Sequence, residues 1–150
     1  MKKHYSLLLF ISFFYFGVSF APLNANSGVQ DGNTIRTFID GENFTQARKA
    51  IKSWQDKDPK ASTPWVFLAE VEYHEKNLKK TISAAQKALD RNPMSAEAYY
   101  WKGMALSGQG KHLEAINELK AAQRGPHPHI PAAKAQENIE AKLNFSAQQK

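Results

Sequence analysis

The feature that most constrains the fold is a spacing that recurs along the chain, the interval between Pro59 and Pro93. Each of these prolines closes one segment before an aromatic-rich segment begins. Because proline lacks the N–H that would extend a preceding helix, each of them predicts a helix end. The spacing therefore indicates a repeated structural unit of about 34 residues.

Small or apolar residues return at the same phase when the chain is shifted by this period. The aligned sets are Ala47, Thr81 and Ala115; Ile51, Ala85 and Leu119; Trp54, Ala88 and Ala122; Trp65 and Tyr99; Phe67 and Trp101; and Ala69 and Gly103. A chance spacing of two prolines would not bring these residue types into register. The period therefore belongs to a genuine repeat.

Each unit reads as two helices joined by a short turn. Ala47, Ala50, Ile51 and Trp54 stand at positions i, i+3, i+4 and i+7, which is one face of a helix. The stretches "LKKTISAAQKAL" and "HLEAINELKAA" repeat this pattern, and a second apolar helix precedes each of them. The polar turns between the two helices are "HEKN" and "GQGK".

Capping residues mark the predicted helix ends. Thr63 followed by Pro64 predicts a capping hydroxyl and then proline at the first helical position, and Ser95 is expected to cap the next helix. Gly108 and Gly110 suit the left-handed residue that ends a helix. Neither helix of such a pair can bury its apolar face alone, so the units are predicted to stack around a shared core.

These residues resemble those of the tetratricopeptide repeat family, whose units carry an aromatic residue, then Leu-Gly or Leu-Ala, a turn, spaced alanines and a closing proline. Residues 62–95 fit best, through Trp65, Leu68-Ala69, Ala88 and Pro93. Residues 96–129 fit as a further repeat, and in residues 26–61 only the second helix fits. The resemblance implies an all-α fold, a stacked helix-turn-helix solenoid.

Some residues depart from the family pattern. Lys102 stands where Leu68 stood, Glu72 takes a usually aromatic place, and Thr81 replaces the usual alanine. Gly32 and Gly41 weaken the first helix of the first repeat. Residues 130–150 are predicted to form a capping helix over the last apolar face, followed by the polar tail "SAQQK".

The resemblance also implies where a partner binds, because the first helix of each pair lines a concave surface in this family. The predicted groove residues are Thr63, Val66, Glu70, Tyr73, Glu97, Tyr100, Met104 and Ser107. The two tyrosines offer aromatic contact, which recognition surfaces favour, and the two glutamates favour a ligand with basic character. The alternative is that both tyrosines only pack between helices.

Some family members hold a partner's terminal carboxylate with lysine, arginine and asparagine side chains. The corresponding places here hold Val66, Phe67, Glu70, Tyr100, Trp101 and Met104. A carboxylate-binding groove is therefore not expected.

Nothing in the sequence predicts an enzyme or a cofactor site. His127 and His129 bring two imidazoles together in a proline-rich connection, but two ligands are too few for a zinc site. The formal net charge is +6, yet the basic residues are scattered rather than gathered in the stripe that a nucleic-acid surface needs. We therefore expect no cofactor, no metal and no nucleic acid.

The N-terminal segment has the composition of a secretory signal peptide. Lys2 and Lys3 precede an uncharged apolar run, Tyr5–Phe20, which is shorter than the ~20 residues of a spanning helix. Removal of residues 1–25 would leave one domain-sized chain, exported to the periplasm or secreted. The alternative is an uncleaved anchor. The chain contains no cysteine, so it has neither a disulfide nor a lipidated cysteine.

The sequence therefore predicts a non-enzymatic interaction module that binds a peptide or protein partner in its concave groove, within a cell envelope of bacterial type. The alternative function is a membrane-anchored envelope assembly factor, a homo-oligomer that self-associates through the ends of the repeat array. Weak attraction to lipid headgroups would fit either function.

Overall fold

The computed structural model describes residues 27–124 and 127–149, with side chains from residue 31 onward. The described residues form seven α-helices and no strand, which confirms the predicted all-α fold. The predicted signal peptide, residues 1–25, lies outside the described residues. The helices are α1 (Ser27–Asp40), α2 (Phe44–Lys57), α3 (Thr63–His74), α4 (Leu78–Leu89), α5 (Ala96–Gly108), α6 (His112–Ala122) and α7 (Ile130–Gln148).

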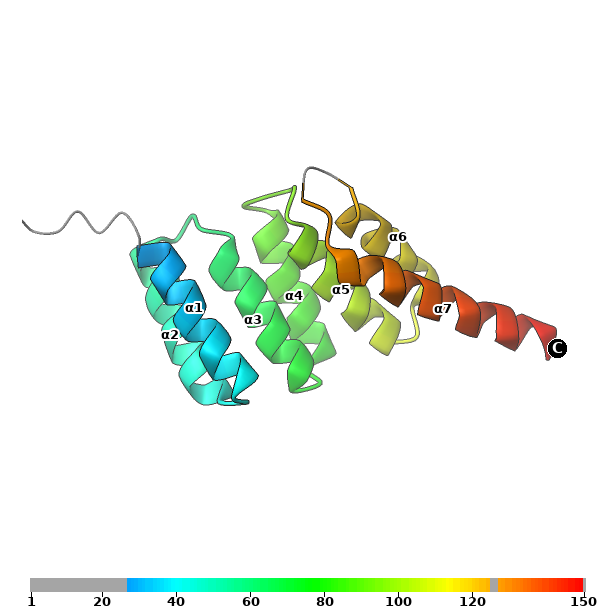
Figure 1. Ribbon diagram of the computed structural model, residues 1–150, viewed down its shortest axis with the longest axis horizontal. Coiled ribbons are helices and arrows are strands. Elements are labelled where there is room, and N and C mark those ends of the chain that lie inside the picture. Colours follow the sequence, from blue (N-terminus) through cyan, green and yellow to red (C-terminus); the bar gives the residue numbers. More distant parts are fainter. Residues whose placement is uncertain (1–26, 125–126, 150) are drawn as a thin grey trace, which may run out of the picture.

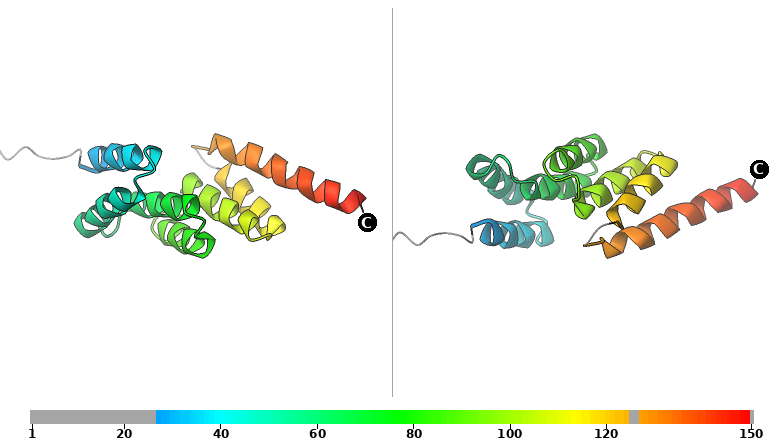
Figure 2. Two further views of the ribbon diagram at one scale, coloured as in Figure 1. Left: turned by 90° about the horizontal axis from the view of Figure 1, so that it is seen from below. Right: turned by 90° about the horizontal axis from the view of Figure 1, so that it is seen from above.

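The first six helices form three antiparallel pairs that stack side by side (Figure 1). α1, α3 and α5 are the first helices of the pairs, and α2, α4 and α6 are the second. Figure 2 shows α1 and the start of α7 on the same side of the stack, flanking α3 and α5. This arrangement is the predicted helix-turn-helix solenoid with about three repeats.

The repeat is visible in the backbone of the turns that join the two helices of each pair. The left-handed conformation recurs with the period of the repeat, at Glu42 (φ 55°), Lys76 (φ 63°) and Gly110 (φ 79°). The N–H of the residue that follows each of them donates to a carbonyl five residues earlier, at 2.8–3.0 Å. One turn geometry therefore serves all three pairs, although only the third turn uses the glycine that this conformation favours.

The structure corrects two details of the predicted helix ends. Gly108 is the last residue of α5 and does not adopt the left-handed conformation. A glycine fits this position for a steric reason, because a Cβ there would lie 2.9 Å from Leu78 Cδ1. The capping position of α3 is Ser62, and Thr63 is already helical. The Ser95 cap is confirmed, since its Oγ accepts from the Ala98 N–H at 3.3 Å.

Equivalent positions of the three repeats are buried, as the period of about 34 residues predicts. Ala47, Thr81 and Ala115 are each 0% exposed, and Thr81 satisfies its buried hydroxyl by donating to the Asn77 carbonyl at 3.2 Å. A Cβ on Gly103 would lie 2.9 Å from Leu119 Cγ, so the absence of a side chain at this position lets α5 and α6 approach each other closely. The departure at Lys102 is also accommodated, because its Nζ lies 2.8 Å from a Glu118 carboxylate oxygen.

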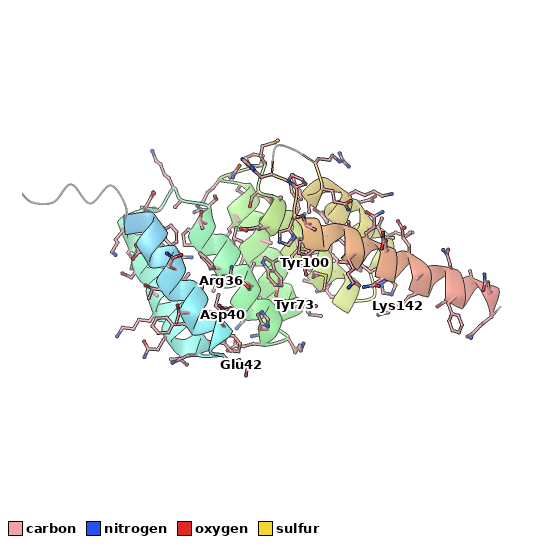
Figure 3. The ribbon with its side chains drawn as sticks, in the orientation of Figure 1. Arg36, Asp40, Glu42, Tyr73, Tyr100 and Lys142 are labelled. Atoms are coloured by element: carbon pink, nitrogen blue, oxygen red, sulfur yellow. The ribbon has the colours of Figure 1, made fainter. Side chains whose placement is uncertain are left out.

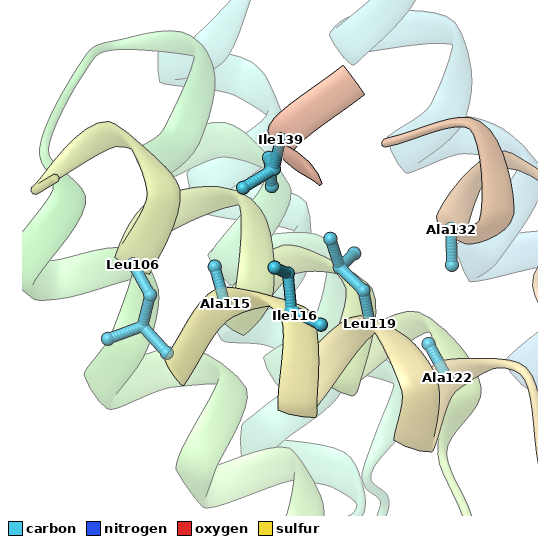
Figure 4. Packing of buried hydrophobic residues seen from close by; sticks show 7 residues of the cluster. All are labelled: Leu106, Ala115, Ile116, Leu119, Ala122, Ala132 and Ile139. Carbon is cyan, nitrogen blue, oxygen red and sulfur yellow. The ribbon is translucent and has the colours of Figure 1, made fainter. Parts of the chain in front are cut away.

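Both ends of the array are completed by helices. α1 forms despite Gly32, because Ile35 and Ile39 bury against Ala47 and Ile51 of α2. At the other end α7 places Ala132 and Ile139 over the apolar face of α6, which confirms the capping helix (Figure 4). The polar tail was expected to follow this helix, but α7 continues through Ser146, whose hydroxyl donates to the Lys142 carbonyl at 2.8 Å.

The acidic departure at Glu72 is part of a buried polar network. Glu72 is 5% exposed, Arg48 donates to one of its oxygens, and Asn77 Nδ2 donates to the other at 2.9 Å. Burial alone would raise the pKa of Glu72, but the bonds from Arg48 and Asn77 outweigh it and leave that pKa below its usual range. Arg48 also contacts Glu75, so the network ties α2 to the end of α3.

Replacing glycine with alanine should have opposite effects on stability at Gly110, which lies in a turn, and at Gly32, which lies in a helix. Gly110→Ala should lower the free energy of unfolding by about 1 kcal/mol, because alanine is strained at positive φ although no atom crowds the site. Gly32→Ala should raise it by roughly 0.5–1 kcal/mol, because Gly32 lies within α1 and its added Cβ would make only ordinary contacts, at 3.7 Å or more. Urea unfolding of both variants measures this, and effects of equal sign would contradict it.

The Glu72 network predicts a dependence of stability on pH. Since the pKa of Glu72 is lower in the folded state, its ion pair contributes stability above the unfolded pKa of about 4.3 and loses it as the pH falls below that value. Glu72→Gln should cost about 1–2 kcal/mol at pH 7, and the difference from the native chain should shrink between about pH 5 and pH 3.

Urea unfolding at several pH values tests this prediction, with Glu114→Gln as the control. Glu114 is exposed, and its carboxylate makes only a long, solvent-screened ion pair with Lys111, at 3.7 Å. Its loss should therefore change the free energy of unfolding by less than ~0.5 kcal/mol. A Glu72→Gln penalty that stays constant down to pH 3 would rule out the ionised network.

Candidate functional site

Two adjacent clefts lie on the face that α1, α3, α5 and the start of α7 form together. The Glu70 cleft has a volume of about 260 Å³ and is lined by Arg36, Val66, Glu70, Glu97, Tyr100, Trp101, His129 and Pro131. The Met104 cleft has a volume of about 350 Å³ and is lined by Tyr100, Met104, Ser107, Pro131, Lys134, Ala135, Asn138, Ile139 and Lys142. Since Tyr100 and Pro131 line both, the two clefts adjoin on one surface.

The structure brings most of the predicted groove residues together. Val66, Glu70 and Glu97 line the Glu70 cleft, Met104 and Ser107 line the Met104 cleft, and Tyr100 lines both. Thr63, the first residue of α3, is exposed and lines neither cleft.

Tyr73 also lies outside both clefts, with its ring centroid 5.4 Å from that of Trp101. Figure 3 shows Tyr73 and Tyr100 on the same face of the array. This contact with Trp101 fits the alternative that the sequence left open, a tyrosine that packs between helices, and the predicted groove role of Tyr73 stays a prediction.

Glu70 is a nearly buried carboxylate with one satisfied oxygen. It is 6% exposed, and its Oε1 accepts from the Arg36 guanidinium, which reaches across from α1. The guanidinium carbon of Arg36 also lies 5.1 Å from the centre of the Phe67 ring. Glu70 Oε2 is buried and has no hydrogen-bond partner among the described residues.

Tyr100 forms the aromatic wall between the two clefts. Its ring meets the Trp101 ring edge-on at 4.9 Å and packs against the His129 imidazole at 4.3 Å. Burial, with smaller contributions from Tyr73 and Glu70, raises the pKa of the Tyr100 hydroxyl. The hydroxyl therefore remains protonated at neutral pH and can donate a hydrogen bond.

His129, which precedes the first residue of α7, lines the Glu70 cleft beside Tyr100. Burial lowers the pKa of its imidazole, and the nearby Glu97 carboxylate opposes this shift only in part. The imidazole is therefore neutral at pH 7. Its Nδ1 is buried and, within residues 27–124 and 127–149, has no hydrogen-bond partner.

Sequence reasoning missed Arg36 and the residues contributed by His129 and α7. Arg36 stands one repeat period before Glu70, so projecting the groove positions onto the first repeat would have found it. His129 and α7 could not be found in this way, because α7 lies outside the repeat and its position depends on packing against α6.

Neither a metal centre nor a membrane span emerges from the part of the chain that the structure describes. His127 is exposed, and no three acidic or histidine side chains gather closely enough there to hold a metal ion. No described helix combines the length and the apolar character needed to cross a bilayer.

Comparisons with known proteins agree with this architecture. Residues 81–128 match the tetratricopeptide repeat family. No curated protein matches the sequence. Many solved structures share the fold, at sequence identities low enough that the likeness concerns the fold alone.

Three of these structures illustrate the degree of similarity. The first tetratricopeptide repeat domain of human RPAP3 has a TM-score of 0.71 and 16% identity, covering 81% of this chain and 96% of its own. MamA has a TM-score of 0.65 and 19% identity, covering 82% and 67%. The TPR2B domain of yeast Sti1, in complex with an Hsp70 peptide, has a TM-score of 0.61 and 18% identity, covering 81% and 99%. Together with the helix pairs described above, these matches show that the chain has a tetratricopeptide repeat fold with about three repeats.

Proposed function

We propose that this chain is a non-enzymatic interaction module that binds an extended segment of a partner protein along the Glu70 and Met104 clefts. The observation that carries this proposal is that the two clefts adjoin and share Tyr100 and Pro131. Successive side chains of one extended peptide could occupy them in turn.

The size and lining of the clefts support a peptide over a small molecule. Their volumes, about 260 and 350 Å³, lie at or below the low end of the ~300–1,000 Å³ typical of small-molecule pockets. The Met104 cleft offers the apolar side chains of Met104, Ala135 and Ile139, and it carries Lys134 and Lys142 among its other residues. This combination suits an apolar side chain of a peptide whose backbone stays partly in water.

Peptide complexes of similar folds support the same proposal. A Spaghetti (RPAP3) domain bound to an HSP90 peptide has a TM-score of 0.70 and 16% identity to this chain. The stacked helices present a preformed surface in this fold, so binding would cost little ordering of the module itself.

The proposed place of action is a cell envelope of bacterial type, reached by export. The support is the basic head Lys2-Lys3 followed by the uncharged run Tyr5–Phe20. The mass of the protein isolated from its source would show whether residues 1–25 have been removed.

Filling the Met104 cleft should abolish partner binding. Asn138 is exposed and lines this cleft, whereas its neighbour Glu137 is exposed and does not. Asn138→Trp should place an indole in the cleft and leave the thermal unfolding temperature nearly unchanged. Glu137→Trp adds the same side chain outside the cleft and serves as the control.

Affinity capture from an envelope extract, followed by mass spectrometry, measures this. The native chain and Glu137→Trp should retain the same partner, and Asn138→Trp should lose it. Retention by all three proteins would show that the partner binds elsewhere.

A second candidate function is self-assembly through the C-terminal end of the array, as a membrane-anchored envelope factor. Large apolar side chains are exposed there: Leu113 (73%) on α6, and Ile130 (85%) and Phe145 (63%) on α7. Sedimentation velocity over a range of concentrations separates the two functions. A monomer at every concentration would remove this candidate, and an oligomer abolished by Phe145→Ser would favour it.

A further inference from the structure

Two residues that line the Glu70 cleft each have a buried polar atom whose hydrogen-bonding capacity is unused among the described residues. These atoms are Glu70 Oε2, on a carboxylate whose residue is 6% exposed, and Nδ1 of His129. A buried, unpaired oxygen on a charged group costs roughly 1–3 kcal/mol or more. Because Oε2 is buried, a small rotation of the Glu70 carboxylate toward the cleft is needed before a ligand can donate a hydrogen bond to it and recover this free energy.

The charges around the cleft favour a positively charged donor. The cleft lining contains two carboxylates, Glu70 and Glu97, and one cation, Arg36. Arg36 is engaged with Glu70 Oε1 and the Phe67 ring, and the neutral His129 adds no charge. Lys134 and Lys142 line the Met104 cleft rather than this one. The lining therefore carries one uncompensated negative charge.

The aromatic walls suit the same class of ligand. Tyr100 and Trp101 line the cleft, and their rings meet edge-on at 4.9 Å. Aromatic faces attract lysine and arginine head groups, and the attraction grows when the cation is partly desolvated. An anionic group would instead face two carboxylates and would leave Glu70 Oε2 unpaired.

We propose that the Glu70 cleft is a specificity site for a lysine or arginine side chain of the bound segment, whose charged group donates to Glu70 Oε2. This inference rests on the proposed peptide-binding function and names the chemistry that the bound segment must carry. The site selects for a cation, the reverse of a groove built to hold a carboxylate.

Selection from a displayed library of random short peptides tests the inference, using the protein expressed from its full sequence. Peptides retained by the native chain should be enriched in lysine or arginine at one position. Glu70→Gln/Glu97→Gln should lose this enrichment. Glu114→Gln/Glu137→Gln removes the same charge from exposed sites outside the cleft and should keep it.

One selected peptide then permits a double-mutant cycle by fluorescence polarisation. Replacing its basic residue with methionine should raise Kd about ten-fold or more against the native chain, the order expected for a charge-assisted hydrogen bond. The same replacement should change Kd less than about two-fold against Glu70→Gln/Glu97→Gln. Should Glu70→Gln fail to fold, as judged by circular dichroism, Glu97→Gln alone should still weaken the preference for the basic residue.

The outcomes separate this inference from the function on which it rests. One possible result is a set of peptides that bind the native chain, fail to bind Asn138→Trp, and show no preference for lysine or arginine. This result would overturn the cation site and leave the peptide-binding function standing. The cation site would also be overturned if the methionine replacement weakened peptide binding equally for the native chain and for Glu70→Gln/Glu97→Gln. Selection of no peptide by the native chain would overturn both.

Discussion

The close approach of paired helices is the constraint on which the rest of this structure depends. Gly103 lies so near α6 that an added Cβ would be 3.1 Å from the Ala115 carbonyl oxygen and 2.9 Å from Leu119 Cγ. Interiors are packed too densely to absorb such a clash without moving a helix. Because α5 also carries Tyr100 and Met104, its packing against α6 fixes the position of Tyr100, which lines both clefts, and of Met104, which lines one of them.

The repeat period made most of the fold predictable from the sequence, since burial and turn geometry recur with it. Ala47, Thr81 and Ala115 are fully buried at one phase, and Glu42, Lys76 and Gly110 are left-handed at another. Six of the eight groove residues that the family resemblance implied line one or both of the two clefts. The wall formed by His129 and α7 was not predictable, because it depends on how a helix outside the period packs on α6.

Two glutamates on α3 show how neighbouring residues of one type acquire different roles. Glu72 and Glu70 are 5% and 6% exposed, yet Glu72 has both oxygens paired, to Arg48 and Asn77, and holds α2 to α3. Glu70 lines a cleft and has one oxygen paired and one buried without a partner in the described residues. The family resemblance places Glu70 in the groove and Glu72 at a usually aromatic position, but it predicts a partner for neither. Their partners appear only when α1 brings Arg36 to Glu70 and α2 brings Arg48 to Glu72.

α7 has two effects on this molecule that cannot be separated. It covers the apolar face of α6, and its first turn and inner side supply Pro131, Asn138 and Ile139 to the clefts. A further repeat stacked in place of α7 would bury the same face of α6 and lengthen the solenoid, but it would remove six of the nine residues that line the Met104 cleft. In this chain the site exists only where the array stops, so its number per molecule stays at one however many repeats precede it.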